Sequence, residues 1–213
     1  MVENIKVFTH NSIRIQNGGK AIYIDPFEMK HAPHDADYIL ITHDHYDHFS
    51  PSDIAAVAKA ETVLVVPEKM ADKTDKVKES VGKTETIAQG ETKDICGFVL
   101  ETIPAYNTIK PFHMKSAGWV GYIFEAFGKR IYIAGDTDVT KEALGVKCDI
   151  ALVPIGGFYT MDPKAAAELI NVIKPETAIP THYGSIVGSP EDGTKFAALV
   201  NAPVKVEILM GID

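Results

Sequence analysis

The sequence predicts an α/β (α+β) fold in which two β-sheets pack face to face with helices on their outer sides. Two observations lead to this prediction. Apolar runs of strand length first follow one another and then alternate with helical segments, and the second half of the chain shows the same order again. The chain of 213 residues is long enough for a substantial core, and no linker or low-complexity segment divides it. We therefore expect a single domain over residues 1–213.

Short apolar runs bounded by turn residues predict the strands of the first half. We expect strands at residues 4–9, 12–16, 21–25, 38–42 and 63–66. Residues 17–20 read Asn-Gly-Gly-Lys, which is a hairpin turn signal between the second and third strands. A helix is expected at about residues 51–60 and a short one after Pro67. Residues 83–95 are polar and predict only short strands and turns.

The second half of the chain alternates strands with longer helices. We expect strands at residues 97–103, 119–126, 130–134, 149–154, 178–181 and 204–209. The turn at residues 127–129 joins two of these strands in a hairpin. Asp162-Pro163 predicts the start of a helix that runs to about residue 173 with one apolar face, and Ser189-Pro190 predicts the start of the last helix.

Composition and charge limit the partners. The formal net charge is −8 and no basic stripe is visible, which argues against nucleic acid, because phosphate binding needs clustered Lys and Arg. The N-terminus lacks a basic region followed by an apolar stretch, and no apolar run reaches membrane-spanning length. We expect a cytoplasmic protein with a small-molecule partner; the sequence leaves the oligomeric state open.

One short segment concentrates metal-binding side chains. Residues 43–48 read His-Asp-His-Tyr-Asp-His, so three histidines and a carboxylate follow the spacing H-x-H-x-D-H. Imidazole nitrogen and carboxylate oxygen are ligands that zinc, manganese and ferrous iron take from proteins. The alternative is a polar surface loop that is rich in histidine by chance, and the placement of the segment argues against it.

The segment lies between a buried strand and a helix. The apolar run at residues 38–41 precedes it. Ser50 after it is a good N-cap, Pro51 suits the first helical position, and Asp53 follows three residues beyond the cap. The cluster is therefore confined to a short loop, which can serve two adjacent metal ions.

Metal-capable residues also follow other predicted strands. Asp25, the 43–48 cluster, Asp136 and His182 each come just after an apolar run. A rigid sheet that carries several polar groups at one rim can assemble a site from loops far apart in sequence. We expect these residues to meet.

The ordered set resembles the metallo-β-lactamase-fold hydrolases: Asp25, the 43–48 motif, Asp136 in Gly-Asp-Thr, and His182 in Thr-His-Tyr-Gly. The resemblance covers nearly the whole chain and is closest to a compact branch of metal-dependent hydrolases related to L-ascorbate-6-phosphate lactonase. It implies a four-layer αββα sandwich of two mixed sheets. In that branch a histidine near the N-terminus reaches toward the site, and His10 matches it.

The resemblance also implies a ligand set for two adjacent ions. The first ion would be bound by His43, His45 and a third ligand, and the second by Asp47, His48 and His182. Asp136 would bridge the two ions. Asp25 would hold the ligand loop through hydrogen bonds from behind the ligands.

The chain departs from the family at one place. The family expects a histidine in a Pro-Ala-x-His context after the middle strand, whereas residues 104–107 read Pro-Ala-Tyr-Asn. Either Asn107 coordinates through its amide oxygen, which suits harder cations than zinc, or His113 six residues later replaces the histidine. If neither binds, one tightly held ion remains. The cofactor is therefore expected to be one or two Zn²⁺ ions, with Mn²⁺ or Fe²⁺ as alternatives.

Metal-assisted hydrolysis is the chemistry that such a site allows. A divalent metal lowers the pKa of bound water toward about 7 and polarises the bond to be cleaved. Asp136 would orient the attacking hydroxide, and Asp47 or His182 would relay a proton to the leaving group. No serine or cysteine nucleophile stands out. We predict a hydrolase of a small ester, lactone or phosphoester.

Three residues are candidates for contacts with the substrate. Lys110 is the candidate cation for an anionic substrate, and Tyr106 and Tyr183 flank the expected rim. Two other functions stay open: a metal-binding domain with weak or no catalysis that acts as a sensor, and an iron-based redox enzyme of the same fold. The second would need a flavin or rubredoxin partner module that this chain lacks the length to carry.

Overall fold

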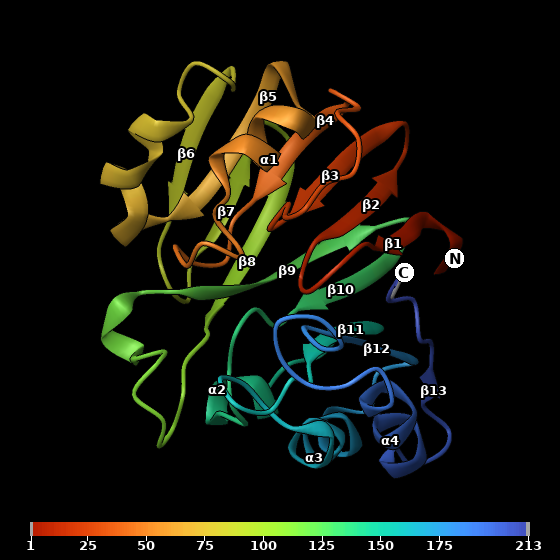
Figure 1. Cartoon of the computed structure of the whole chain (residues 1–213). Helices are drawn as coiled ribbons and strands as arrows, with labels where there is room; N and C mark the ends of the chain where they lie inside the picture. The colour runs from red at the N-terminus through yellow and green to blue at the C-terminus, as the bar shows by residue number, and fades with distance from the viewer. Residues whose placement is uncertain (1, 212–213) are drawn as a thin grey trace.

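Two β-sheets stack face to face in the computed structural model, which describes residues 2–211, and helices cover their outer sides (Figure 1). The predicted sandwich is confirmed. The first sheet has the order β1 (Ile5–Val7), β2 (Ile13–Asn17), β3 (Lys20–Ile24), β4 (Ala36–Leu40), β5 (Ala58–Pro67) and β6 (Lys83–Ile87). The second sheet has the order β13 (Lys205–Val206), β12 (Thr177–Thr181), β11 (Ile150–Pro154), β10 (Lys129–Ile133), β9 (Val120–Ala126), β8 (Phe98–Pro104) and β7 (Thr92–Ile95).

Both sheets are mixed and follow the same plan. Each begins with antiparallel neighbours, β1 to β3 in the first sheet and β7 to β10 in the second. Each continues with parallel neighbours, β3 to β6 and β10 to β13. Since parallel neighbours end at the same edge of a sheet, the loops after β10 and β12 emerge together from the second sheet. The loop after β4 of the first sheet lies beside this edge, where the carbonyl of Thr42 accepts a hydrogen bond from the backbone N–H of Val120 at 3.2 Å.

The central strands carry apolar runs where both of their faces are buried. In β3, Ile22 and Ile24 face the core between the sheets, while Tyr23 faces the outer core under α1 (Pro51–Val57). In β4, Leu40 faces the core between the sheets and Ile39 faces the outer core. This two-residue period places one continuous core between the sheets and a second, smaller one outside the first sheet.

Helices α1 and α3 begin where the sequence predicts caps, whereas α4 begins at Asp192, three residues after the predicted Ser189. Ser50 accepts a hydrogen bond from the backbone N–H of Asp53 at the start of α1. Asp162 caps α3 (Pro163–Ile173), whose buried face includes Leu169 and Ile170 and covers the second sheet together with α4 (Asp192–Leu199) and α2 (Lys141–Leu144) (Figure 1). The remaining helical segments are 3-10 helices: η1 (Val2–Asn4), η2 (Glu68–Lys76) and η3 (Lys115–Ala117).

Several predicted boundaries were wrong. The helix expected at 51–60 ends at Val57, because Ala58 pairs with Ala36 and Thr62 donates a hydrogen bond to the carbonyl of Ala36, 2.6 Å away. The strand expected at 63–66 is therefore much longer. Residues 83–95 form β6 and β7, through which the chain crosses from one sheet to the other.

The last strand and one helix also differ from expectation. The strand expected at 204–209 is regular only over β13, although Met210 forms a bridge with Val7. Helix α2 was not predicted; its four residues are too few for an apolar period, and Thr140 caps it. None of the helices within residues 2–211 is long and apolar enough to span a membrane.

Candidate metal centre

Loops from both sheets meet at one edge of the sandwich. The connection from β1 to β2 carries His10, and the loop after β4 carries residues 43–48. Asp136 follows β10, His182 follows β12, and His113 lies between β8 and β9. Three groups of these side chains place ligand atoms within 4.8 Å of one another. The expected meeting of strand-end residues therefore occurs.

The first group consists of His43, His45 and His113. His43 Nε2 lies 3.1 Å from His45 Nδ1. The indole of Trp119 packs against all three imidazoles at centroid distances of 4.8–5.4 Å and covers one side of the group. His43 and His113 are buried while His45 is partly exposed, so solvent reaches the group from the side of His45.

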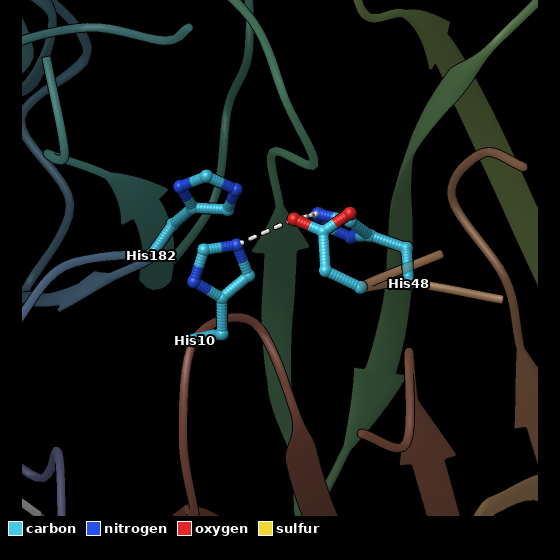
Figure 2. Close-up of side chains that lie close together, drawn as sticks. His10, His48 and His182 are labelled. Carbon is cyan, nitrogen blue, oxygen red and sulfur yellow. Dashed lines mark hydrogen bonds and ion pairs between the residues drawn. The ribbon is translucent and has the colours of Figure 1, made fainter. Parts of the chain in front are cut away.

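The second group consists of His10, Asp47, His48 and His182. His10 Nε2 donates a hydrogen bond to Asp47 Oδ2 at 2.9 Å, and the His10 and His182 rings lie with their centroids 3.6 Å apart and their planes tilted by 41°. Figure 2 shows the three imidazoles converging on one space. His10, expected only to reach toward the site, thus lies among the candidate ligands.

The third group consists of His43, His48 and Asp136, and Asp136 lies between the other two groups. Its Oδ2 is 3.2 Å from His113 Nε2 and 3.1 Å from His182 Nε2. Its Oδ1 is 3.5 Å from His48 Nε2, and His43 Nε2 is 3.9 Å from Oδ2. One carboxylate therefore contacts histidines of both groups, which is the position that a bridging ligand needs.

Gly135 allows Asp136 to reach this position. Its φ is +63°, and a Cβ there would lie 3.0 Å from the carbonyl oxygen of Val120 and 3.1 Å from Thr42 Cβ. The loop after β10 thus approaches the ligand loop of the first sheet more closely than a larger residue allows.

Several buried ligand atoms of this cluster make no well-aligned hydrogen bond among the described residues, although His113 Nε2 and His182 Nε2 lie 3.2 and 3.1 Å from Asp136 Oδ2. The atoms concerned are His48 Nε2, His113 Nε2, His182 Nε2 and Asp136 Oδ1. Each such atom costs about 1–3 kcal/mol when it is left unpaired. Because these atoms converge and are the donor types that zinc, manganese and iron bind, the residues suit a divalent metal.

Contacts behind the ligands fix which nitrogen of each histidine faces the cluster. Asp25 Oδ2 accepts hydrogen bonds from His48 Nδ1 at 2.7 Å, Thr42 Oγ1 at 2.6 Å and Asn11 Nδ2 at 2.8 Å. Since the Thr42 hydroxyl gives its hydrogen to Asp25, it accepts one from His43 Nδ1, 3.0 Å away. His43 and His48 therefore both present Nε2 to the cluster, which is how carboxylates behind metal-binding histidines act.

Asn107 orients His113 in the same way. Asn107 Oδ1 accepts hydrogen bonds from the backbone N–H and the Nδ1–H of His113, each at 3.1 Å. Its Nδ2 donates to the carbonyl of Tyr159 at 2.9 Å. Of the two alternatives for the missing histidine, the geometry favours His113, because Asn107 Oδ1 is occupied behind that ring.

Left-handed backbone conformations occur at three residues of the cluster. The φ angles are +54° at His10, +44° at Asp25 and +59° at His182. Residues other than glycine adopt this conformation at a cost, and such strain concentrates at functional sites. The backbone N–H of His182 donates to the carbonyl of His10 at 2.7 Å, which ties two of these strained residues together.

Burial keeps part of the cluster neutral. It lowers the pKa of His10 to about 4, although the hydrogen bond with Asp47 works in the opposite direction. Burial and the neighbouring His48 ring hold the pKa of His43 well below its ordinary value. Both imidazoles are therefore unprotonated near neutral pH, which is the form that binds metals.

The carboxylates are ionised and draw a proton to His48. Burial opposes ionisation of Asp136, but the charges of His182 and His48 hold its pKa well below the ordinary value. The hydrogen bond from His10 lowers the pKa of Asp47 to about 2 despite its burial. Burial works against protonation of His48, yet Asp136 and Asp25 raise its pKa to about 9. A metal must displace that proton to bind.

Lys110, expected to face an anionic substrate, joins two loops instead. Its Nζ donates to Asp138 Oδ1 at 2.9 Å and to the backbone carbonyls of Gly157 and Thr160 at 3.2 and 2.5 Å. These three bonds use the donors of the ammonium group and hold residues 157–160 beside the loop that carries His113.

The two tyrosines expected at the rim also make structural contacts. Tyr106 donates a hydrogen bond to Glu142 Oε2 of α2 at 2.9 Å. Tyr183 is buried with its hydroxyl against Gly193 of α4, where an added Cβ would lie 2.5 Å from that oxygen. Both side chains are thus directed toward helices.

Sequence reasoning missed two residues that shape the site. Thr42 was assigned only as the last residue of a strand. Its hydroxyl directly precedes the histidine motif, and this is the feature that could have indicated a role in holding the ligands. Trp119 is the only tryptophan of the chain and was assigned to a strand; its packing against the histidines depends on a contact between sheets.

A cavity of about 690 Å³ lies nearby, lined by β1, residues 28–35 and residues 183–185. It touches Thr9 and Tyr183, the neighbours of His10 and His182, but no residue of the three metal-capable groups. It therefore lies next to the second group without including its side chains.

Comparison with known proteins identifies the family. The model of the β-lactamase superfamily domain matches residues 4–182. A UPF0173 metal-dependent hydrolase of Pyrococcus abyssi is 33% identical, with 96% of this chain and 95% of that protein covered, and one of Thermus thermophilus is 31% identical, with 92% and 90% covered.

Solved structures agree with this assignment. A protein of Parabacteroides distasonis has a TM-score of 0.79 and 31% identity, with 96% of this chain and 91% of that chain covered. Igni18, a metallo hydrolase of Ignicoccus hospitalis, has the same fold with a TM-score of 0.79 at 23% identity, with 97% and 94% covered. The relation to L-ascorbate-6-phosphate lactonase stays a prediction. The chain belongs to the β-lactamase superfamily, among its metal-dependent hydrolases.

Proposed function

We propose that the protein hydrolyses a small ester, lactone or phosphoester with two Zn²⁺ ions, and that Mn²⁺ or Fe²⁺ can take their place. We further propose that it acts in the cytoplasm on a small molecule, without nucleic acid or membrane partners. The observation that carries the proposal is the convergence of the buried Nε2 atoms of His48, His113 and His182 on Asp136.

The two groups of side chains divide the ligands. His43, His45 and His113 would hold one ion. The other would be held by Asp47, His48 and His182, with Asp136 shared between the ions and His10 close to the second. When bound, the metal supplies a nucleophile from water at neutral pH and polarises the bond to be cleaved.

Side chains of the protein would position the ligands, transfer protons and exclude water. Asp136 fixes the positions of the two groups relative to each other, because its two oxygens contact histidines of both. Asp47 is ionised and partly exposed, and its Oδ2 is held at 2.9 Å by His10 Nε2, so it can accept a proton from the attacking water and relay it to the leaving group. Trp119 keeps water away from one side of the histidines.

Hydrolysis of chromogenic substrates tests the proposal. Zn²⁺- or Mn²⁺-loaded protein should cleave at least one of 4-nitrophenyl acetate, a simple lactone and bis(4-nitrophenyl) phosphate, and a chelator should abolish the activity. Asp136→Asn should lower kcat/KM by about a hundredfold or more. Asp37→Asn is the matched control, because Asp37 pairs with Lys59 away from the cluster. Turnover that survives both the chelator and Asp136→Asn would contradict the proposal.

A further inference from the structure

Three aromatic side chains form an exposed group beside the metal-capable cluster, and we name it the aromatic rim: Phe112, Phe158 and Tyr159. Their ring centroids are 4.8–5.5 Å apart, with Phe112 and Phe158 each meeting Tyr159 at 81°. Phe112 directly precedes His113. Phe158 is 65% exposed, Phe112 38% and Tyr159 36%.

The aromatic rim is tied to the cluster by hydrogen bonds. Asn107 links His113 to the carbonyl of Tyr159 through its two amide atoms. Lys110 bonds to the carbonyls of Gly157 and Thr160 on either side of the two aromatic residues. The rings are therefore held in place before any ligand arrives, which lowers the cost of binding one.

Exposed apolar side chains gather on the loops of the site. Most of the large apolar side chains exposed in the described chain lie on these loops: Tyr46, Ile109, Phe112, Met114, Phe158, Tyr159 and Ile186. Tyr46 lies within the 43–48 motif, and Ile186 follows the loop that begins at His182. Among them the three rings of the aromatic rim contact one another, and contiguous exposed apolar surface of this kind marks a binding site.

Three lysines near the cluster are paired with carboxylates. Lys73 is paired with Asp44, which lies within the ligand motif. Lys115 is paired with Glu142 at 2.6 Å. Lys110 is paired with Asp138 at 2.9 Å. A negatively charged substrate would therefore have to compete with these carboxylates for each cation.

We infer that the substrate is an uncharged ester or lactone that carries an aromatic or other flat apolar group, and that the aromatic rim binds this group. The inference rests on the proposed function, because it assumes that the scissile bond lies at the metal-capable cluster. Rings stacked edge to face leave apolar faces open, and a flat group gains most from contact with such faces. The occupant is a small molecule, since the rim adjoins His113 directly.

Binding of hydroxamates to the Zn²⁺-loaded protein tests the proposed metal site and the proposed role of the aromatic rim separately. All three probes bind metal through the hydroxamate group. Acetohydroxamate measures binding to the metal alone, benzohydroxamate carries a phenyl ring as well, and succinate monohydroxamate carries a negative charge. Isothermal titration calorimetry gives the three dissociation constants. Benzohydroxamate should bind about tenfold more tightly than acetohydroxamate, and succinate monohydroxamate should gain nothing. Phe158→Ala should remove most of the difference in affinity between benzohydroxamate and acetohydroxamate. Val172→Ala, which shortens an exposed apolar side chain on α3, should preserve that difference.

Each other outcome overturns the inference in its own way. Equal affinity for the acetyl and phenyl probes would refute the aromatic rim as a substrate contact and leave the metal site intact. Tighter binding of succinate monohydroxamate would assign an anionic substrate. A concentration-dependent dimer that dissociates on Phe158→Ala, seen by analytical ultracentrifugation, would assign the rim to a second copy of the chain. Binding of no hydroxamate would overturn the proposed function together with the inference.

Discussion

Replacing Asn107 with alanine removes the group that orients His113 while leaving the histidine in place. The substitution deletes the acceptor of two hydrogen bonds from His113, both 3.1 Å long, and the donor to the Tyr159 carbonyl. The Nδ1–H of His113 then loses its partner in a buried site, and the ring is free to turn its Nε2 away from Asp136.

The expected losses follow from these contacts. Removing a partner behind a metal ligand lowers metal affinity by about 10- to 100-fold, which corresponds to about 1.4–2.7 kcal/mol of binding free energy. The unpaired polar groups lower the free energy of unfolding of the metal-free protein by about 1–3 kcal/mol. Asn107→Asp keeps the acceptor for the Nδ1–H, so it should bind metal at least as tightly as Asn107→Ala does.

Competition with a fluorescent zinc chelator measures the affinity, and urea denaturation of the metal-free protein measures stability. Asn171→Ala is the matched control, because Asn171 also bridges two backbone groups but joins α3 to the end of α4, away from the cluster. It should lower stability without changing metal affinity. If Asn107→Ala binds two ions as tightly as the wild type, Asn107 does not orient a ligand. If Asn107→Ala loses an ion that His113→Ala keeps, Asn107 is itself the ligand and the reasoning fails.

Three other predictions concern the surroundings of the cluster. Asp25→Ala leaves the hydrogen bonds of His48 and Thr42 unmade and should lower the free energy of unfolding by about 3–5 kcal/mol in denaturant titrations; an effect below about 1 kcal/mol would contradict the role given to Asp25. Because the pKa of His48 is raised to about 9 in the metal-free protein, metal binding must release its proton, and the dissociation constant should fall about tenfold for each unit of rising pH below that value. A flat pH profile in the chelator competition assay would show that His48 does not bind the metal. Gly156→Ala places a Cβ 2.3 Å from the carbonyl oxygen of His182 and should lower the free energy of unfolding by about 1–3 kcal/mol in denaturant titrations. Gly145→Ala is the control, because its Cβ would lie 3.4 Å from the carbonyl oxygen of Glu142, and it should change the free energy of unfolding very little.

The sandwich and the meeting of strand-end residues could be predicted because both depend on local patterns. Strands buried on both faces have apolar runs, as over the whole of β11 and at residues 38–40 of β4. Asp25, Asp136 and His182 follow such runs, so the end of each run locates a site residue. The caps of α1 and α3 were also readable from adjacent residues.

Other features depend on contacts that no local pattern contains. The preference for His113 over Asn107 rests on a hydrogen bond within the loop between β8 and β9. Lys110 appeared available to a substrate because Asp138 and Thr160 are distant in sequence. Residues 58–62 have the composition of a helix, yet pairing with Ala36 draws Ala58 into a strand. In each case a tertiary partner outweighs the local preference.

The number of metal ions per chain tests the central claim most directly. Protein purified without a metal-affinity tag would be measured by inductively coupled plasma mass spectrometry, for the wild type and for His113→Ala. We predict about two zinc or manganese ions per wild-type chain and about one in the variant, because His113 completes only the first group of ligands. Two ions in both proteins would remove His113 from the ligand set. An absence of metal in the wild type, even after reconstitution, would contradict the account that the converging histidines and Asp136 form a metal centre.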